Sequence, residues 1–477
     1  MVMYLRKKLK AMSTLIKNKT ITTVNPTTGK SLKDYPLMTN EEASEAVKKC
    51  HEAFVKWKKY SLAERAEVLK KIGSTLKDYK EEFSKLMTSE MGKLVSQAEE
   101  EIDLCAAICE YTAENGQKEL ANEPERELPD GGRGIITYSP IGVIYGIQPW
   151  NFPAYQVVRY AIANLMAGNG VLLKHAEGTT GSGLMLEEIF EKAGLPKGLF
   201  TVLIIDHDQS DDIINNDFVR GVTFTGSPNG GRAVAKKAAG NLKKTVLELG
   251  SNDAYLVLDD ADLETAVEWS VKGRIYNNGE TCVAAKRFVV TEKNYDAFLE
   301  SFVEKMKNVK FGDPTKEDTQ IGPMARQDLR EKLHEQVEES VKNGAKVLCG
   351  GGIPDGDGFF YPATVLANVN PGQPAYDDEL FGPVASVIKA KDDEDAMRIA
   401  NDSRFGLGGG IFSKDEKKAI ELAEKHFDTG MVFINSFGVA QPNMPFGGVK
   451  NSGYGREHGG FGIKEFVNTK AINILQG

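Results

Sequence analysis

Hydrophobic residues recur at two different spacings along the chain, and the first spacing is helical. From about Glu41 to Leu120, apolar residues fall every three or four positions, beginning with NEEASEAVKKCHEAFVKW behind an Asn cap. Acidic residues in the first turn of this segment favour a helix, because they interact with the positive end of the helix dipole. The pattern predicts a set of amphipathic helices in the N-terminal quarter.

Short apolar runs alternate with helical segments from Gly134 to Leu258. The runs are GVIYGIQ, GVLLKH, FTVLIID, GVTFTG and AYLVLDD, and SGLMLEEIFEKAG is one of the helical segments between them. This alternation is typical of βαβ units around a parallel sheet. A second series, with strand-like KRFVVT and VASVIKA and helical NYDAFLESFVEKMKNV, follows Asp259. We therefore expect two doubly wound α/β domains.

The C-terminal segment GIKEFVNTKAINIL alternates strand-like residues and has no obvious partner in either domain. An exposed strand tends to pair with another chain, and a subunit interface is a natural place for it. The segment predicts a homo-oligomer, either a homodimer or a homotetramer.

Composition and charge narrow the class of protein. The 477 residues are 41% hydrophobic and 27% charged, with a formal net charge of −9, whereas nucleic-acid binders need a basic face. Lysines interrupt the apolar residues of MVMYLRKKLKAMSTLIKNK, so this basic N-terminus is interpreted as a frayed extension and not as a signal or membrane-surface segment. No apolar run elsewhere approaches the roughly 18 residues that span a bilayer. We expect a soluble, cytoplasmic protein with no nucleic-acid or membrane partner.

Five cysteines are few for this length and fit a reducing compartment. Cys105 and Cys109 share a helix face, but no His or further Cys lies nearby at ligand spacing, so we expect buried thiols and no metal site. Cys282 is different, because NNGETCVAAKR surrounds it with turn residues between a helix and a strand. Such a loop could present a thiolate, while the alternative is a small buried hydrophobic residue.

Two further positions carry groups that carbonyl chemistry needs. Glu248 follows the apolar run of TVLELGSND, which places its carboxylate at the carboxyl end of a sheet strand. Apolar surroundings would raise its pKa towards the range of a useful base, unless it is a solvent-facing Glu. Asn151 lies between two prolines in QPWNFP, and its amide could donate to a developing oxyanion without carrying a charge.

Two segments suggest a dinucleotide site. FTGSPNGGRAVAKKA is a short strand followed by Gly226, Ser227 and a helix, and a helix N-terminus attracts phosphate. The segment lacks the GxGxxG fingerprint, so spacing alone is a weak signal. VLLKHAE places Lys174 and Glu177 after another strand, where they could hold ribose hydroxyls.

Together these motifs resemble the aldehyde dehydrogenase superfamily. PWNFP, K-x-A-E, FTGS, ELG, N-x-G-x-x-C, DDELFGPV and PFGGVKNSGYGRE occur in the order of that family, over nearly the whole chain from about Val24. The resemblance implies a cofactor domain (1–121 and 141–249), a catalytic domain (250–446) and oligomerisation strands (122–140 and 460–477). WNFPAYQVVR and NNGETCVAAKRF resemble bacterial succinate-semialdehyde dehydrogenases most.

The resemblance also implies a role for each matched residue. Cys282 would attack the aldehyde, Asn151 and the Cys282 backbone N–H would stabilise the oxyanion, and Glu248 would activate the water that hydrolyses the thioester. Three sets of contacts to NAD or NADP are implied. Lys174 and Glu177 would bind the adenosine ribose, and Ser227 and Trp150, with Gly226 beside them, would bind the phosphates. Glu379 and Phe381 would bind the nicotinamide ribose. Glu177 favours NAD, because a carboxylate repels a 2′-phosphate.

Substrate charge is predicted from the helix after PWNFP. Arg159, with Tyr155 one turn earlier, would hold the distant carboxylate of a semialdehyde, as succinate-semialdehyde dehydrogenases carry Arg at this place; the alternative is an Arg paired with a structural acid. Phe152 and Ser436 are further candidates to line the entrance. Three other functions stay open: another aldehyde specificity, a CoA-acylating dehydrogenase, and a structural protein that has lost the chemistry.

Two residues depart from the usual family pattern. Ser251 stands where a second glycine usually follows ELG, which is harmless unless that position needs a positive φ. Glu280 stands where Gln is frequent, and its carboxylate would raise the pKa of Cys282 if it pointed inward.

Overall fold

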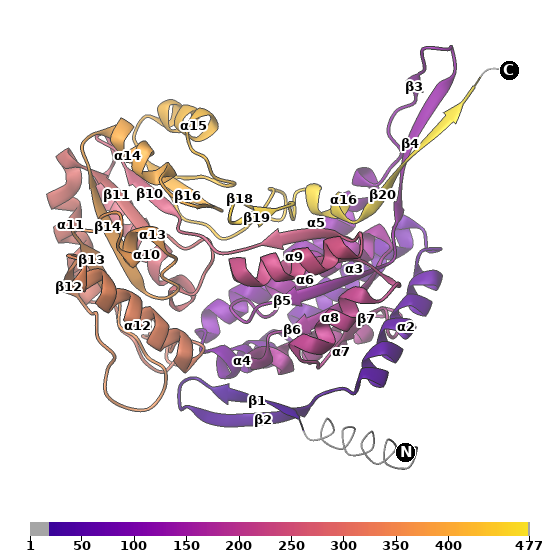
Figure 1. Cartoon of the computed structure of the whole chain (residues 1–477), viewed down its shortest axis with the longest axis horizontal. Coiled ribbons are helices and arrows are strands. Elements are labelled where there is room, and N and C mark those ends of the chain that lie inside the picture. Colours follow the sequence, from indigo (N-terminus) through magenta and orange to yellow (C-terminus); the bar gives the residue numbers. More distant parts are fainter. Residues whose placement is uncertain (1–18, 476–477) are drawn as a thin grey trace, which may run out of the picture.

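The computed structural model describes residues 19–475, which form two α/β lobes beside one another and a strand arm that projects from one end (Figure 1). The prediction of two doubly wound α/β domains with a small strand arm is confirmed. The predicted frayed N-terminal extension lies outside the described residues. Within residues 19–475, no helix is both long and apolar enough to cross a membrane.

Helices clad the first lobe, as their spacing predicts. Capping boxes at Thr39 and Ser61 start the first two of them and satisfy backbone N–H groups that a helix end leaves free. The helices are α2 (Asn40–Trp57), α3 (Leu62–Asp78), α4 (Lys80–Met91) and α5 (Val95–Glu119). A hairpin that the sequence did not predict precedes them, made of β1 (Thr20–Asn25) and β2 (Lys30–Pro36), whose residues are mostly exposed.

The first sheet has the strand order β19-β9-β8-β5-β6-β7, and all pairs except β19 with β9 are parallel. Its strands are β5 (Val143–Gln148), β6 (Gly170–His175), β7 (Phe200–Val202), β8 (Val219–Thr225), β9 (Lys244–Glu248) and β19 (Gly453–Tyr454). Its crossover helices are α6 (Tyr155–Ala167), α7 (Thr180–Lys192), α8 (His207–Asn215) and α9 (Pro228–Gly240), with the short η1 (Glu177–Thr179). The order reverses between β5 and β8, and ligands of open α/β sheets bind at such a point.

The second sheet has the order β12-β13-β14-β11-β10-β16-β17, and hydrophobic clusters cover both of its faces. Its strands are β10 (Ala254–Val257), β11 (Arg287–Thr291), β12 (Lys346–Cys349), β13 (Thr364–Ala367), β14 (Val384–Ala390), β16 (Gly409–Phe412) and β17 (Phe433–Ile434). Its helices are α10 (Leu263–Ile275), η2 (Tyr276–Gly279), α11 (Glu292–Lys307), α12 (Gln327–Lys342), α13 (Pro374–Asp377), α14 (Asp393–Asn401) and α15 (Glu416–Lys425). A two-stranded sheet of β15 (Phe405–Gly406) and β18 (Val449–Lys450) lies apart from it.

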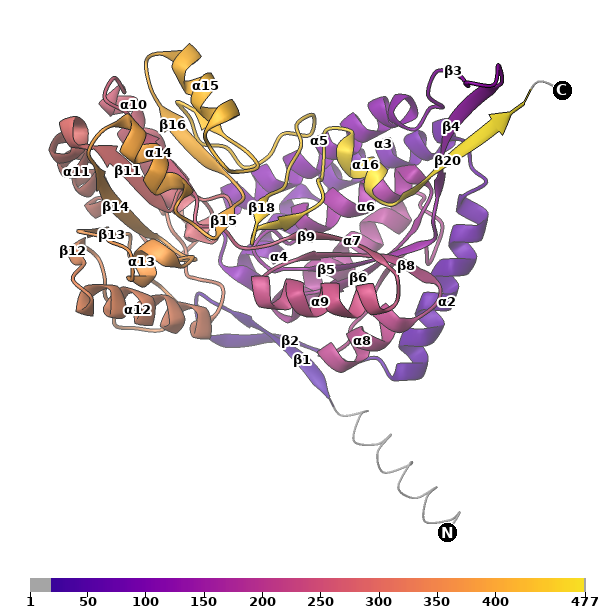
Figure 2. The same ribbon diagram turned by 45° about the horizontal axis from the view of Figure 1, so that its top comes forward.

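The arm pairs the C-terminal strand with a segment from the first third of the chain. β20 (Val467–Ile474) lies antiparallel to β4 (Arg133–Pro140), which also pairs with β3 (Arg126–Glu127). Figures 1 and 2 show that the arm projects away from both lobes. The C-terminal strand therefore has a partner within its own chain. The strand expected over GIKEF is wrong: α16 (Phe461–Glu465) forms there, because Ile463 packs into the core of the first lobe.

Candidate active site

The segment before Cys282 is an unusual turn. Asn277, Asn278 and Gly279 have φ values of 54°, 58° and 75°, a run of left-handed residues that the sequence NNG tolerates. A side chain at Gly279 would collide with the Gly382 backbone, since a Cβ there would lie 2.4 Å from it. The turn carries the chain from α10 to Cys282, whose side chain is half-buried where the two lobes meet.

Asn151 is tied to this turn from the end of β5. Its Nδ2 donates to the Glu280 carbonyl at 3.0 Å, and Asn277 Nδ2 donates to the Asn151 carbonyl at 2.9 Å. An amide nitrogen carries two protons, so Asn151 keeps one donor for a ligand. The structure thus brings Asn151 and the Cys282 segment together.

A buried carboxylate that the sequence analysis missed fixes the helix after Asn151. Glu101 on α5 accepts the backbone N–H groups of Ala154 and Tyr155 at 2.8 Å each, and it forms a buried ion pair with Lys93. These bonds satisfy free donors at the start of α6, which has no side-chain cap of its own. The alternating helical pattern of α5 shows only that Glu101 lies near a buried face, so no local signal reveals this role.

Glu248 ends β9 and is held by its backbone. Glu248 pairs with Thr225 of β8 and with Gly453 of β19, and its side chain is buried. Neither carboxylate oxygen has a hydrogen-bond partner within residues 19–475. Burial raises the pKa of Glu248 to about 8, although the positive charges of Arg159 and Arg456 act against the shift. A carboxyl group with this pKa is suited to general base chemistry near neutral pH.

The thiol of Cys282 is protonated at neutral pH in the free protein. Burial raises its pKa to about 12; Arg159 and Lys286 lower it, while Glu379 and Glu248 raise it. These electrostatic influences place Cys282, Glu248 and Arg159 in one cluster. Glu280 is not part of it, because its carboxylate accepts the Ala325 N–H at 3.1 and 3.2 Å and so points away from the thiol.

Arg159 is buried and is already paired. Its guanidinium forms an ion pair with Glu457, donates to Thr225 Oγ1 at 3.1 Å, and lies over the rings of Tyr155 and Phe446. The expected alternative of pairing with a structural acid is therefore realised. One nitrogen, Nη1, has no hydrogen-bond partner among residues 19–475. A free donor thus remains beside the ion pair.

The other predicted substrate contacts separate into two groups. Tyr155 and Phe152 are buried next to one another with ring centroids 5.9 Å apart, and the Tyr155 hydroxyl bonds His458 Nε2 at 3.0 Å. Ser436 is not joined to them, because its hydroxyl donates to the Ile434 carbonyl at 3.1 Å. No motif in the sequence marks His458, which lies in the C-terminal Gly-rich segment.

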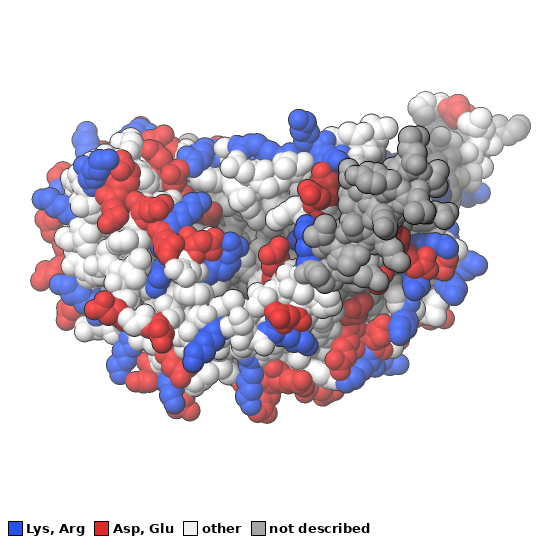
Figure 3. All heavy atoms as spheres, turned by 60° about the horizontal axis from the view of Figure 1, so that its bottom comes forward, with Lys and Arg blue, Asp and Glu red and all other residues white. Residues whose placement is uncertain are grey.

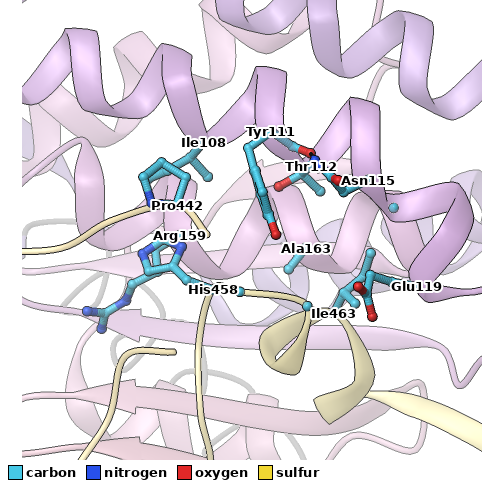
Figure 4. A pocket seen from close by; sticks show the side chains of 13 residues that line it. Ile108, Tyr111, Thr112, Asn115, Glu119, Arg159, Ala163, Pro442, His458 and Ile463 are labelled. Atoms are coloured by element: carbon cyan, nitrogen blue, oxygen red, sulfur yellow. Dashed lines mark hydrogen bonds between the residues drawn. The ribbon is translucent and has the colours of Figure 1, made fainter. Parts of the chain in front are cut away.

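A small cavity of about 30 Å³ lies between α5, α6 and the C-terminal segment. Tyr111, Glu119, Arg159 and His458 are among its lining residues. In Figure 4 the Arg159 guanidinium points away from Tyr111 and Glu119, so the cavity borders the stem of this side chain. Its volume holds one or two water molecules.

The predicted cofactor residues line two larger cavities that meet at an aromatic pair. Trp150, Lys174 and Glu177 line one of ≈ 510 Å³; Ser227, Glu379 and Phe381 line the other, of ≈ 370 Å³. Trp150 and Phe381 contact edge to face, with ring centroids 5.8 Å apart. Gly226 lies in the turn before Ser227 and lines neither cavity.

The chemistry of these walls fits a dinucleotide. Ser227 caps α9 by accepting the Gly230 N–H, and the positive end of this 13-residue helix opens into the smaller cavity with Arg232. These groups suit phosphates, whereas the carboxylates of Glu379 and Glu177 suit ribose hydroxyls. On the face in Figure 3, basic and acidic side chains of the described residues are mixed.

The site combines a thiol, an amide donor and an isolated carboxyl, which are the groups that covalent carbonyl chemistry needs. The walls of the two neighbouring cavities suit a dinucleotide. The pattern of the aldehyde dehydrogenase family matches residues 15–472. The chain belongs to the aldehyde dehydrogenase family, and the resemblance inferred from its motifs is confirmed.

Relatives of this chain carry more specific names. The succinate semialdehyde dehydrogenase (NAD(P)+) Sad of Escherichia coli K12 is 42% identical over 449 residues, which are 94% of this chain and 96% of that protein. The succinate-semialdehyde dehydrogenase (NADP(+)) of Deinococcus radiodurans is 40% identical, with 95% and 94% covered. A crystal structure of succinic semialdehyde dehydrogenase from Streptococcus pyogenes in complex with NADP+ has a TM-score of 0.93 at 37% identity, with 96% and 100% covered.

Proposed function

We propose that this enzyme oxidises succinate semialdehyde to succinate with NAD or NADP, through a covalent intermediate on Cys282. The observation that carries the proposal is the cluster of Cys282, Asn151 and Glu248, with the cationic Arg159 adjoining it. The names of relatives that are about 40% identical over most of the chain support the substrate.

In the first step, the Cys282 sulfur attacks the aldehyde carbon, and the carbonyl electron pair moves onto oxygen. The free amide proton of Asn151 and the Cys282 backbone N–H stabilise this oxyanion. Because the pKa of Cys282 is about 12, its proton must leave to a base as the sulfur attacks. Glu379 and Phe381 would hold the nicotinamide ribose, and a bound nicotinamide would supply the hydride acceptor that turns the thiohemiacetal into a thioester.

In the second step, Glu248 takes a proton from water, which attacks the thioester carbon and expels the Cys282 thiolate with the carboxylic acid as product. The carboxylate has no competing hydrogen bond within the described residues, so it is free to bind this water. Its raised pKa means that it binds the proton strongly enough to remove it and releases it above about pH 8.

Arg159 supplies the substrate specificity in this proposal. The carboxylate of the four-carbon semialdehyde would bind the unpartnered Nη1 of Arg159, beside the ion pair with Glu457. Tyr155 and Phe152 would flank the carbon chain, and Ser436 would line the entrance.

Exchange of Arg159 tests the substrate. We expect Arg159→Met to lower kcat/KM for succinate semialdehyde by about 30- to 1000-fold, or ~2–4 kcal/mol, and to spare an uncharged aldehyde of similar length. Since the single change leaves Glu457 buried without its partner, a double variant with Glu457→Gln serves as the matched control. Equal losses on both aldehydes in the double variant would show that Arg159 supports the fold alone.

We also propose that NAD is preferred over NADP. Glu177 is exposed at the edge of the larger cavity, 3 residues after Lys174, and its charge would repel a 2′-phosphate. A preference for NAD would distinguish this chain from relatives that are named for NADP(+). The ratio of kcat/KM values for the two cofactors tests it, and Glu177→Gln should shift that ratio towards NADP. A wild-type ratio that favours NADP would contradict it.

The arm provides a surface for a homodimer or homotetramer, which we propose on the basis of its open edge. β20 pairs on one side only and exposes Ile472 and Ile474, and Leu475 directly after it is exposed as well. All five cysteines are free thiols, which supports a cytoplasmic location. Sedimentation of the wild type and of a variant with Lys at Ile472 would test the assembly.

A further inference from the structure

Two residues behind the nucleophile, Lys286 and Ser251, converge on the peptide groups that carry it. Lys286 Nζ donates to the Cys282 carbonyl at 2.6 Å, to the Thr281 carbonyl at 3.2 Å and to Ser251 Oγ at 2.9 Å. The Ser251 hydroxyl donates in turn to the Cys282 carbonyl. An ammonium group has three protons, so these bonds use all of its donors.

The same network reaches the cofactor cavity. Glu379 Oε1 lies 3.2 Å from Lys286 Nζ and accepts the Ser251 backbone N–H at 3.0 Å. Lys286 is fully buried, whereas the Glu379 side chain is partly exposed and lines the cavity with Phe381. The buried charge of Lys286 is therefore balanced by a carboxylate that lines the proposed cofactor cavity.

These bonds fix the direction of the oxyanion donor. In a planar trans peptide the C=O and the N–H point in opposite directions. When Lys286 holds the Thr281 carbonyl on its side, the N–H of Cys282 points to the other side. That N–H has no hydrogen bond with another backbone group or side chain in residues 19–475, so it is available to a ligand.

We propose that Lys286 and Ser251 are positioning residues: Lys286 holds the carbonyls of Thr281 and Cys282, and Ser251 holds the Cys282 carbonyl, so that the Cys282 N–H and thiol face the substrate. This inference rests on the proposed function of Cys282. The Lys286 charge also favours the thiolate, because it lowers the pKa of the Cys282 thiol. Ser251 stands where the family usually has glycine, and a serine fits because φ at this position is not positive.

Two measurements on the full chain test the proposal. The first is the rate at which iodoacetamide alkylates Cys282 without substrate or cofactor, followed by mass spectrometry between pH 6 and 10. The second is kcat and the cofactor KM. Ser251→Ala removes one hydroxyl but keeps the backbone bond to Glu379, so we expect kcat to fall about three- to tenfold with an unchanged cofactor KM.

Lys286 variants separate the hydrogen bonds from the charge. Lys286→Met removes both, and we expect alkylation at pH 8 to slow about tenfold and kcat to fall about 100-fold. Lys286→Gln keeps a donor, so kcat should recover in part while alkylation stays slow. Both Lys286 variants should also change the cofactor KM, because Glu379 loses its cation.

Ser270→Ala is the matched control, since Ser270 is a buried serine on α10 whose hydroxyl has no partner within the described residues. It should leave kcat and alkylation unchanged. If Lys286→Met fails to fold, Ser251→Ala still decides the question. Wild-type kcat and alkylation in Ser251→Ala, or a kcat loss that Ser270→Ala shares, would overturn the proposal. Alkylation of Cys282 that leaves wild-type turnover intact would overturn the nucleophile assignment itself.

Discussion

The two residues that we propose as nucleophile and general base are held in opposite ways. The Cys282 peptide is bound through its carbonyl by Lys286 and Ser251, and the turn before it is tied to Asn151. Glu248 has no side-chain hydrogen bond within the described residues, although it is buried close enough to Cys282 for its charge to raise the pKa of the thiol. Hydrogen bonds thus fix the direction of the Cys282 group (the aimed group), whereas no hydrogen bond fixes the Glu248 carboxylate (the free group).

The chemistry explains this difference. A nucleophile and an oxyanion donor act at one position, so bonds that fix their direction help the transition state. A general base needs a pKa near the working pH, and hydrogen bonds to its carboxylate would lower that pKa. Isolation of Glu248 keeps its pKa at about 8, while the strand pairing of β9 still fixes where its backbone lies.

Removing the aimed group should have the largest effect. Cys282→Ala should lower kcat by at least about 10⁴-fold, because no other group can form the covalent intermediate. Cofactor binding, measured by fluorescence titration, should stay within a few-fold of wild type, since the cofactor residues remain. Oxidation at near wild-type rates would refute the mechanism.

Removing the free group should leave half of the reaction intact. Glu248→Gln should lower steady-state kcat about 10²- to 10⁴-fold, while a rapid burst of reduced cofactor, equal to the number of sites, survives. Stopped-flow absorbance at 340 nm measures both phases. If the burst disappears together with turnover, Glu248 also takes the proton from Cys282, and the division of labour between the two residues is wrong.

The pH dependence of kcat probes the isolation of Glu248. Only the ionised carboxylate can accept a proton, and a pKa of about 8 leaves it mostly protonated at pH 6 to 7. When deacylation limits turnover, kcat should therefore rise about tenfold per pH unit up to pH 8 and then level off. A profile that is flat from pH 6 to 9 would mean that Glu248 is ionised throughout, as a hydrogen-bonded carboxylate would be.

The sequence predicted the parts of this picture that are local. Alternating apolar runs indicated the parallel sheets, and the turn residues around Cys282 indicated a loop that could present a thiolate. Arg159 was placed correctly on one face with Tyr155, one turn apart on α6.

Contacts between distant segments could not be predicted in the same way. Glu457, near the C-terminus, pairs with Arg159, and β20 pairs with β4, although both partners lie in the first third of the chain. Lys286 lies four residues after Cys282 and looked like the start of a strand, because its role depends on Ser251 and Glu379 coming from other segments. Pairing of this kind is decided by the fold and leaves no periodic signal.

The smallest change should crowd the free group without removing it. Gly447 has a φ of 147°, and a Cβ on it would lie 2.7 Å from Glu248 Oε1 and 2.9 Å from the Gly455 carbonyl oxygen. The carboxylate can rotate away, but the backbone of Gly455 cannot, so Gly447→Ala should displace Glu248 and strain the loop. We expect kcat to fall about three- to tenfold with an unchanged burst, because the Cys282 side of the cleft is untouched.

Gly240→Ala is the control for this change, since a Cβ at the end of α9 meets no atom within 4 Å. It should leave both phases as in wild type. The comparison between the two reactive residues requires that Gly447→Ala slow deacylation alone. A smaller burst in this variant would show that the positions of Glu248 and Cys282 are coupled through the loop. Packing would then restrain the Glu248 carboxylate even though no hydrogen bond does.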